Sequence, residues 1–505
     1  MARPRGLSIL IGILQNRLCT AAVQTIPMLS AGLQDSYADL VQTQLKRSRS
    51  LDMFGTGVAS RTIPRNDARV SMSIIRRSAV VLLWLTAPPL LFAAINSNDP
   101  YMVPLRGAGN IALVVVSVAI VLALIRSGLW RRPGITGRLL ILLWCLPPLA
   151  MLGAHLSFEI RKRNVLHTEP AQAARLGRHV MVGYSSFDEV AVLAEKGLIG
   201  GIYVTRHNVA GRTADAVSAE LAALQRRRRA AGLPPLIVAA YQEGGIVAHL
   251  APPLTRLPAL STLAALAPDH RAEEAERLGR IHGQELAALG VTLNLAPVLD
   301  LKPEARRNRL DFNTLIGQRA ISGDPATVSA IALPYIHGLE ASGVGAVVKH
   351  FPGLGRVTSD THHFTAELDT PIEQLEASDW RPFREVLAGS RAQLMVGHVK
   401  LTALDPDAPA SHSRRIIDGV IRKQWHYQGI VMTDDLVMGA IYQHDVCTAV
   451  VEALNAGVDL LLVAYDGAQF YRIFACAMAA DARQQIESAV LAESDARLRR
   501  AFPLD

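Results

Sequence analysis

Three uncharged apolar runs constrain the fold of this chain more than any other feature of its 505 residues. They cover Ser78–Asn98, Gly107–Ile125 and Leu139–Phe158, and only short segments separate them. Each run is about 20 residues long, so that an α-helix could cross the roughly 30 Å of hydrocarbon in a bilayer. Buried helices of a soluble domain are the alternative, but three such runs in close succession favour a membrane region. We therefore expect three transmembrane helices, over about 78–98, 107–125 and 139–158.

The arginines beside these runs indicate how the region crosses a bacterial inner membrane. The loop between the first and second runs carries only Arg106, whereas the opposite flanks carry Arg76, Arg77, Arg126, Arg131, Arg132 and Arg138. Because basic residues gather on the cytoplasmic side, the first run should start in the cytoplasm. Everything after residue 158 should then lie on the periplasmic or extracytoplasmic side. The group Arg161–Arg163, directly after the third run, argues for the opposite orientation.

Composition sets further limits on the class of protein. Half of the residues are hydrophobic and 19% are charged, which excludes a disordered or fibrous chain. The net charge of +8 is diffuse, and its densest run, Arg226–Arg229, ends a helical pattern. This is typical of a solvated helix end, so we expect no nucleic-acid partner. The four cysteines have no metal-ligand spacing, and the sequence predicts neither a disulfide framework nor a zinc site.

The remaining sequence divides into an extension, a linker and a second domain. Residues 1–71 show no sustained periodicity and no signal-peptide design, so we expect a poorly ordered extension before a membrane region at 72–158. Residues 159–174 are expected to form a linker. A domain of different character should occupy 175–505.

This second domain alternates short β-branched runs with helical stretches such as Ala272–Leu289 and Pro325–Ser342. The runs are Val180–Tyr184, Gly201–Thr205, Leu236–Tyr241, Val291–Ala296, Ala346–His350, Leu394–Val399, Ile430–Thr433 and Val458–Ala464. Eight strand-then-helix units predict an α/β fold, a (β/α)8 barrel of the TIM type, preceded by the three transmembrane helices. An open doubly wound sheet is the alternative.

In such a barrel, chemistry gathers at the carboxyl ends of the strands. Polar side chains follow five of the runs at this end: Tyr241 and Glu243, Asn294 to Asp300, Lys349 and His350, His398, and Asp434 and Asp435. A chance distribution would scatter these groups over both ends of the barrel.

A glycine-rich loop follows Lys349 and His350 and carries Asp360 and His362. Residues two apart in an extended segment project to the same side, so Asp360 can accept a hydrogen bond from His362. Such a bond would fix the tautomer of the imidazole and raise its basicity, as a general acid/base requires.

Asp434 and Asp435 end the seventh run, where strand alternation lets only one of them point into the mouth of the barrel. A carboxylate there, opposite a proton donor, is what double-displacement hydrolysis of a glycoside needs. A metal site is the competing interpretation, with ligands from Asp434, Asp435, His350 and His398.

These motifs resemble glycoside hydrolase family 3, and in particular its single-domain NagZ-type β-N-acetylglucosaminidases (β-N-acetylhexosaminidases). The similarity runs from Val180 to the C-terminus and includes Gln242–Gly245, Leu295–Asp300, Ile316–Arg319, Asp324-Pro325, Lys349–Gly353, Asp360–His362, Pro409–Ser411 and Thr433–Leu436. The resemblance implies that Asp434 is the nucleophile and that Asp360 and His362 form the acid/base dyad. It also implies a sugar held by Arg319, Lys349 and His350, with no metal and no cofactor. Tyr241, Glu243, Asp300 and His398 complete the expected sugar-binding set.

The chain departs from the family pattern at three positions. The family usually has Asp where this chain has Tyr241, Arg where it has Ile246, and His where it has Leu354. A tyrosine can stack on a sugar or hydrogen-bond it, but it lacks the two strong acceptor atoms of a carboxylate. The departures therefore bear on which sugar is bound more than on the reaction type.

The leading hypothesis is a membrane-anchored, retaining β-N-acetylhexosaminidase acting on cell-wall fragments or related glycans. A β-glucosidase-like family 3 enzyme of different sugar specificity is one alternative. A catalytically silent, membrane-anchored glycan-binding barrel is a second, and Asp434 with the Asp360–His362 pair argues against it. A transporter or assembly factor is a third, but the apolar runs contain no acidic residue that could couple an ion.

Overall fold

The computed structural model describes residues 65–131, 135–303, 315–357, 360, 366–442 and 445–502. Among the predicted site residues, His362 lies outside this set, as does residue range 1–64 of the predicted extension. The chain divides into two compact units, Met1–Thr86 and Ala87–Asp505, and the second contains the whole second domain.

Within the described residues, three helices are long and apolar enough to cross a membrane. They are Arg76–Ile95 of α3 (Arg65–Ile95), α4 (Ala108–Arg126) and α5 (Thr136–Leu166). Their most apolar windows have mean hydropathies of 2.0, 2.7 and 2.0, and few of the residues in those windows are buried. A short 3-10 helix, η1 (Pro100–Leu105), connects α3 to α4. The helices therefore coincide with the three apolar runs of the sequence.

The boundaries of this region differ from the expected ones. α3 already begins at Arg65, inside the segment expected to be poorly ordered. The segment expected to be a linker is largely helical, because α5 continues to Leu166 and α6 (Pro170–Gly177) follows. The physical reason is packing: Phe158 of α5 contacts Tyr471 edge-on, with ring centroids 5.7 Å apart, so a helix is retained beyond the apolar run.

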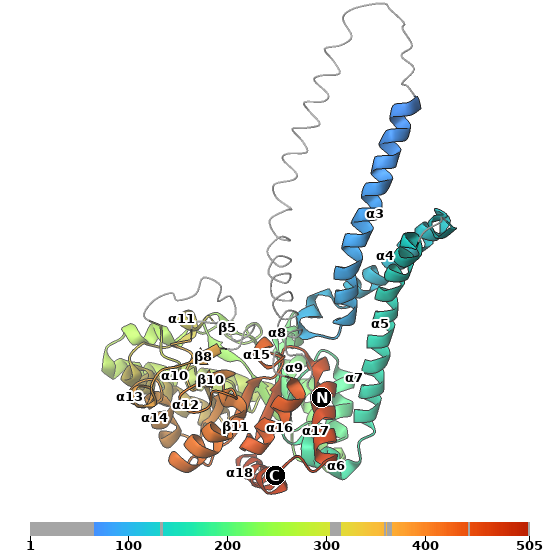
Figure 1. Ribbon diagram of the computed structural model, residues 1–505. Coiled ribbons are helices and arrows are strands. Elements are labelled where there is room, and N and C mark those ends of the chain that lie inside the picture. Colours follow the sequence, from blue (N-terminus) through green and yellow to red (C-terminus); the bar gives the residue numbers. More distant parts are fainter. Residues whose placement is uncertain are drawn as a thin grey trace, which may run out of the picture. The chain divides into compact units, whose positions relative to one another are not determined.

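The second domain is a closed barrel of parallel strands surrounded by helices (Figure 1). Its strands, in the order in which they pair around the barrel, are β1 (Val180–Gly183), β12 (Leu460–Val463), β11 (Val431–Asp435), β9 (Gln393–Val396), β7 (Gly345–Phe351), β6 (Leu293–Asn294), β3 (Ile237–Ala240) and β2 (Gly201–Val204). Each strand overlaps one of the eight predicted runs. The predicted (β/α)8 barrel is confirmed, and the pairing of β1 with β12 excludes an open sheet.

The core of the barrel follows from strand alternation. Met181, Ala239 and Met432 point inward and belong to a hydrophobic cluster inside the barrel. Their sequence neighbours, such as Val182 and Val238, point outward and pack against the helices. Continuous apolar strands are thus needed because both faces of each strand are buried.

The surrounding helices include the two stretches expected from the sequence. These stretches correspond to α10 (Pro268–Leu289) and α12 (Pro325–Glu340), which pack against each other. The others are α7 (Phe187–Glu195), α8 (Arg206–Val209), α9 (Ala214–Ala230), α11 (Ile316–Arg319), α13 (Ile372–Ala377), α14 (Arg381–Gly389), the π-helix η5 (Arg415–Gln424), α15 (Gly439–Tyr442), α16 (Val446–Ala456), α17 (Phe470–Ala482) and α18 (Ser488–Ala501).

The structure contains a disulfide, although the cysteine spacing indicated no disulfide framework. Cys447 of α16 is bonded to Cys476 of α17, with their Cα atoms 5.1 Å apart. The two cysteines are 29 residues apart in sequence, a spacing without a motif, and only the side-by-side packing of α16 and α17 brings them together.

Candidate active site

An ion-pair network lies at the carboxyl end of the barrel and is centred on Glu243. Its carboxylate accepts hydrogen bonds from Arg319 Nη2 at 2.6 Å and Nε at 3.0 Å, and Lys349 Nζ lies 2.7 Å from Oε1. These three side chains are at most 10% exposed. Burial alone would raise the pKa of Glu243, but the charges and hydrogen bonds of Arg319 and Lys349 outweigh it and lower the pKa to about 2. Glu243 thus holds two cations in place and stays ionised.

Lys349 is the fully buried member of this network. Its ammonium group lies 3.9 Å from the centroid of the Tyr241 ring and also donates to the backbone oxygen of Leu295. Burial lowers the pKa of Lys349 to about 8, with Arg319 adding to the effect and Glu243 opposing it. Tyr241 therefore contacts the cation through its ring face, a role that an aspartate at this position would fill with a carboxylate.

His350 is oriented by Asp300. Its Nδ1 donates to Asp300 Oδ2 at 2.6 Å, and Asp300 Oδ1 also accepts from the backbone N–H of Leu354 at 2.7 Å. The other ring nitrogen, Nε2, lies 3.5 Å from Arg319 Nη2. Asp300 is 1% exposed, so it acts through His350 rather than on the mouth itself.

The two adjacent carboxylates at the end of β11 have different surroundings. Asp435 Oδ1 accepts from the backbone N–H groups of Val437 at 3.0 Å and Ala464 at 2.9 Å, and Oδ2 accepts from Tyr465 at 2.7 Å. Burial raises the pKa of Asp435 to about 6 against these hydrogen bonds, and the charge of Asp434 adds to the rise. Asp435 therefore ties the end of β11 to the segment after β12.

Asp434 is 8% exposed, and its Oδ1 accepts from the backbone N–H of Asp435 at 2.8 Å. The charge of Asp434 raises the pKa of Lys349, whereas the charges of both carboxylates raise the pKa of Tyr241. Asp434 is thus the member of the pair whose charge acts on Lys349 of the ion-pair network.

His398, expected to bind sugar, is 0% exposed and contacts protein atoms through both ring nitrogens. Nδ1 lies 2.7 Å from Ser411 Oγ, and Nε2 lies 3.0 Å from the backbone oxygen of Asp435. This geometry makes His398 a support for the end of β11.

The loop after β7 is described only in part. Asp360 is 1% exposed, whereas its predicted partner His362 lies outside the described residues. At the start of the loop, Arg356 Nε donates to Asp379 Oδ2 at 2.7 Å and Nη2 donates to Ser378 Oγ at 3.1 Å. The loop is therefore anchored to the segment between α13 and α14.

Comparison with known proteins decides the family to which this site belongs. The model of the glycosyl hydrolase family 3 N terminal domain matches residues 174–500, which cover the entire barrel. The chain belongs to glycoside hydrolase family 3.

Family 3 relatives of known type support a glycosidase of the NagZ type. A beta-hexosaminidase of Pseudomonas aeruginosa is 36% identical over 272 residues, 54% of this chain and 76% of that protein. The corresponding enzyme of Nitrosomonas eutropha is 33% identical over 273 residues, 53% of this chain and 74% of that protein.

Solved family 3 structures show the same barrel. A beta-N-acetylglucosaminidase from Paenibacillus sp. has a TM-score of 0.60 and 32% identity, covering 66% of this chain and 63% of that one. A beta-N-acetylhexosaminidase from Beutenbergia cavernae has a TM-score of 0.58 and 29% identity, covering 66% and 98%.

Two aromatic side chains that contact Tyr241, Tyr203 and His249, were not among the residues predicted from the family pattern. Tyr203, in β2, packs edge-on against Tyr241 with ring centroids 5.3 Å apart. Its hydroxyl lies within hydrogen-bonding distance of His249 Nδ1, at 2.8 Å, and burial lowers the pKa of His249 to about 4, so this ring is neutral at pH 7. The sequence feature that could have indicated Tyr203 is its place in a predicted strand, near the carboxyl end.

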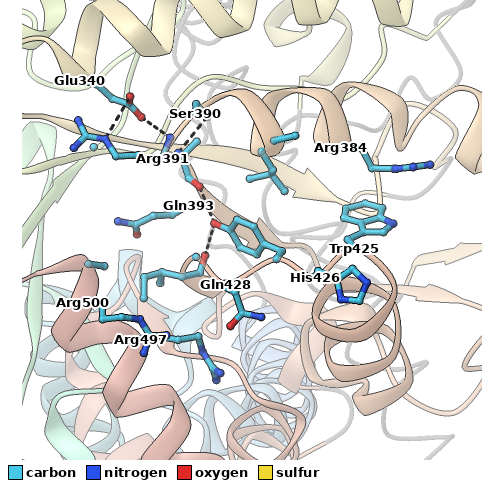
Figure 2. Close-up of a pocket in the computed structure, with 18 of the residues that line it drawn as sticks. Glu340, Arg384, Ser390, Arg391, Gln393, Trp425, His426, Gln428, Arg497 and Arg500 are labelled. Atoms are coloured by element: carbon cyan, nitrogen blue, oxygen red, sulfur yellow. Dashed lines mark hydrogen bonds and ion pairs between the residues drawn. The ribbon is translucent and has the colours of Figure 1, made fainter.

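A large cavity in this family 3 barrel lies at the opposite end from these residues. It measures about 1490 Å³ and is lined by Ile237, Gly345, Gln393 and Ile430, which lie at the amino ends of their strands or directly before them. Figure 2 shows Arg391 beside Glu340 in this cavity, with their charged atoms 3.7 Å apart. None of the predicted site residues that the structure describes lines it.

Proposed function

We propose that this family 3 protein is a membrane-anchored, retaining β-N-acetylhexosaminidase that removes terminal β-linked N-acetylglucosamine from cell-wall-derived or related glycans. The observation that carries the proposal is the division of labour at the end of β11. Asp435 accepts hydrogen bonds from three backbone N–H groups, whereas the charge of Asp434 acts on Lys349 of the ion-pair network. This difference supports Asp434 as the carboxylate that attacks the anomeric carbon.

In the first step, an Asp434 oxygen bonds to the anomeric carbon while the bond to the leaving oxygen breaks, and His362 gives that oxygen a proton. In the second step, His362 takes a proton from water, whose oxygen replaces Asp434 on the same carbon. Lys349 and Arg319 would bind sugar hydroxyl groups, and Glu243 keeps both cations fixed during the two steps. Both inversions occur at one carbon, so the β-configuration is retained.

The proposed location is a membrane with the barrel on the extracytoplasmic side. The arginine distribution supports this orientation, and the Cys447–Cys476 disulfide is an independent argument for it. Disulfides persist in oxidising compartments such as the periplasm and are rare in the cytosol. A cell-wall glycan would be accessible to the barrel on that side.

Hydrolysis of nitrophenyl glycosides by the full chain in detergent tests the activity. We expect release of nitrophenol from the β-N-acetylglucosaminide, with the β-anomer as the first product observed by NMR. No hydrolysis would contradict the proposal, and an α-anomer would contradict the retaining mechanism.

The acid/base role is tested by His362→Ala. An aryl glycoside with a good leaving group needs little protonation, so we expect the variant to lose at least about tenfold more activity on a disaccharide than on the aryl substrate. The conservative control is Thr361→Ser on the same loop. Equal losses on both substrates would contradict the acid role.

A β-glucosidase-like specificity is the second candidate. It is favoured by Tyr241 and Ile246, which stand where the family usually has Asp and Arg. Comparing kcat/KM for the nitrophenyl β-glucoside and β-N-acetylglucosaminide separates the two, since the proposed enzyme should prefer the N-acetylated sugar.

A further inference from the structure

The segment between the first two apolar helices is bound to the catalytic end of the barrel. Arg106 donates from Nη1 to Asp466 Oδ1 at 2.9 Å, and its Nη2 lies 2.8 Å from Oδ2, which makes the pair bidentate. Gln469 adds a hydrogen bond of 2.6 Å to the backbone oxygen of Asn98. Asp466 follows Tyr465, whose N–H binds Asp435, and so it lies next to the catalytic mouth.

Arg106 is also at the edge of the second apolar helix, because α4 begins two residues later at Ala108. Its Nε donates to the backbone oxygen of Ser97 and its Nη2 donates to the backbone oxygen of Asn98. The arginine therefore holds together the two ends of the segment that connects α3 to α4. The rim of the mouth at β12 therefore lies beside the point where the chain enters the proposed bilayer.

The direction of α5 gives the same orientation independently. Along α5 and α6, Phe158 contacts Tyr471, Thr168 contacts Met478 and Gln172 contacts Asp481. In these three pairs the residue numbers rise together, so the chain from the end of α5 through α6 runs parallel to α17. Because α17 starts at the carboxyl end of β12 and returns toward the other end, the apolar part of α5 leaves the barrel at its catalytic end.

The surface near the mouth is apolar in places that would face lipid. Tyr101 and Leu105 of η1 are 43% and 54% exposed, and Tyr465 is 62% exposed. Ile246, at the rim beside Glu243, is 46% exposed. Exposed aromatic and aliphatic side chains of this kind are typical of a membrane–water interface.

We propose that the mouth faces the bilayer and that the substrate is a glycolipid, with its terminal β-N-acetylglucosamine presented from the membrane surface. This inference rests on the proposed function and adds the carrier of the sugar to it. A soluble oligosaccharide would have to enter the space between barrel and membrane, whereas a lipid-linked sugar is already held there at high effective concentration.

The test uses the full chain in nanodiscs that contain a synthetic β-N-acetylglucosaminyl dialkylglycerol. Chitobiose and nitrophenyl β-N-acetylglucosaminide in solution serve as comparison substrates. We expect kcat/KM for the glycolipid to exceed that for chitobiose by at least about tenfold. A preference for chitobiose would overturn the proposal, whereas failure to hydrolyse the nitrophenyl glycoside would instead contradict the proposed function.

Variants of the Arg106–Asp466 pair separate orientation from simple anchoring. Arg106→Gln should reduce glycolipid turnover by about tenfold and nitrophenyl glycoside turnover by less than about twofold. The matched control is Arg126→Gln, at the other end of α4, which should change neither. The exchange of charges in Arg106→Asp with Asp466→Arg should restore part of the loss. Equal losses on both substrates, or none on the glycolipid, would overturn the proposed orientation.

Discussion

Both ends of the barrel bury a network of paired charged side chains, but the two networks have different neighbours. At the catalytic end, Glu243, Arg319 and Lys349 are buried and pair with one another within 3.0 Å. At the other end, Asp459 directly before β12 is also buried, and it pairs with Arg422 at 2.7 Å and with Arg497 at 2.8 Å. Arg391 at this end is 81% exposed, and its contact with Glu340 is 3.7 Å long (Figure 2). Buried and compensated charge therefore occurs at both ends, and the catalytic end is distinguished by the contacts of its network with Tyr241 and His350.

The largest effect that would sharpen this comparison is expected at Asp434. Asp434→Asn should lower kcat for the nitrophenyl glycoside by about 10³-fold or more, because covalent attack supplies much of the barrier reduction. The unfolding temperature should change little. Asp435→Asn is the matched variant and should mainly lower the unfolding temperature, since it disturbs the hydrogen bonds to Ala464 and Tyr465. The reverse pattern would mean that the nucleophile is Asp435.

Glu243→Gln should give the next largest effect, now on stability. Removing one partner of a buried ion pair leaves Arg319 and Lys349 uncompensated, at a cost of about 3 kcal/mol in the free energy of unfolding. Denaturant unfolding at pH 7 measures this, and Glu373→Gln at an exposed position of helix α13 is the control.

The original chain and its Glu243→Gln variant also test how the free energy of unfolding depends on pH. The pKa of Glu243 falls from 4.5 to about 2 on folding, so its stabilising contribution is present above pH 4.5 and lost as the pH falls toward 2. The difference between the original chain and the Gln variant should therefore shrink over that range. A constant difference would show that charge is not its cause.

Tyr241→Asp should have a smaller effect, on sugar binding. The aspartate would offer a carboxylate where the ring now covers Lys349, and KM for the N-acetylglucosaminide should fall by up to about tenfold. Tyr241→Phe keeps the ring and should leave KM within about twofold. A higher KM in Tyr241→Asp would indicate that the ring itself binds the sugar.

The smallest effect is expected at the far end of the barrel. Arg391→Ala removes an exposed, long ion pair, so we expect the free energy of unfolding to fall by at most about 0.5 kcal/mol. We expect no change in kcat/KM. Steady-state kinetics and thermal unfolding check both. A tenfold fall in kcat/KM would break the comparison by linking this end to catalysis.

The barrel could be predicted from the sequence because each strand must be apolar on both faces. The resulting runs, such as Leu460–Val463, are visible without any contact information. The site was predictable as a set of positions, since the carboxyl ends of parallel strands meet in one place. Asp434 and Lys349, far apart in sequence, were expected in one mouth for this reason.

Other features depend on contacts that no local pattern records. The residues alone left open which carboxylate, Asp434 or Asp435, faces the mouth, and the hydrogen bonds of Asp435 with the backbone N–H groups of Ala464 and Tyr465 could not be predicted from the sequence. The Cys447–Cys476 disulfide depends on two helices packing together. His398 was predicted to bind sugar, and the structure adds contacts of its ring with Ser411 and with a backbone oxygen. Each of these contacts joins segments that are separated along the chain.

The closure of β12 onto β1 has a consequence for biosynthesis. β12 also pairs with β11, and the two residues after it hold Asp435 through their N–H groups. A ribosome makes β1 early and β12 last, after the apolar helices have already emerged. Until Tyr465 has been synthesised, the barrel is an open ribbon and the carboxylate beside Asp434 lacks its partners. We therefore expect the nascent chain to be inactive until β12 and Tyr465 have left the ribosome.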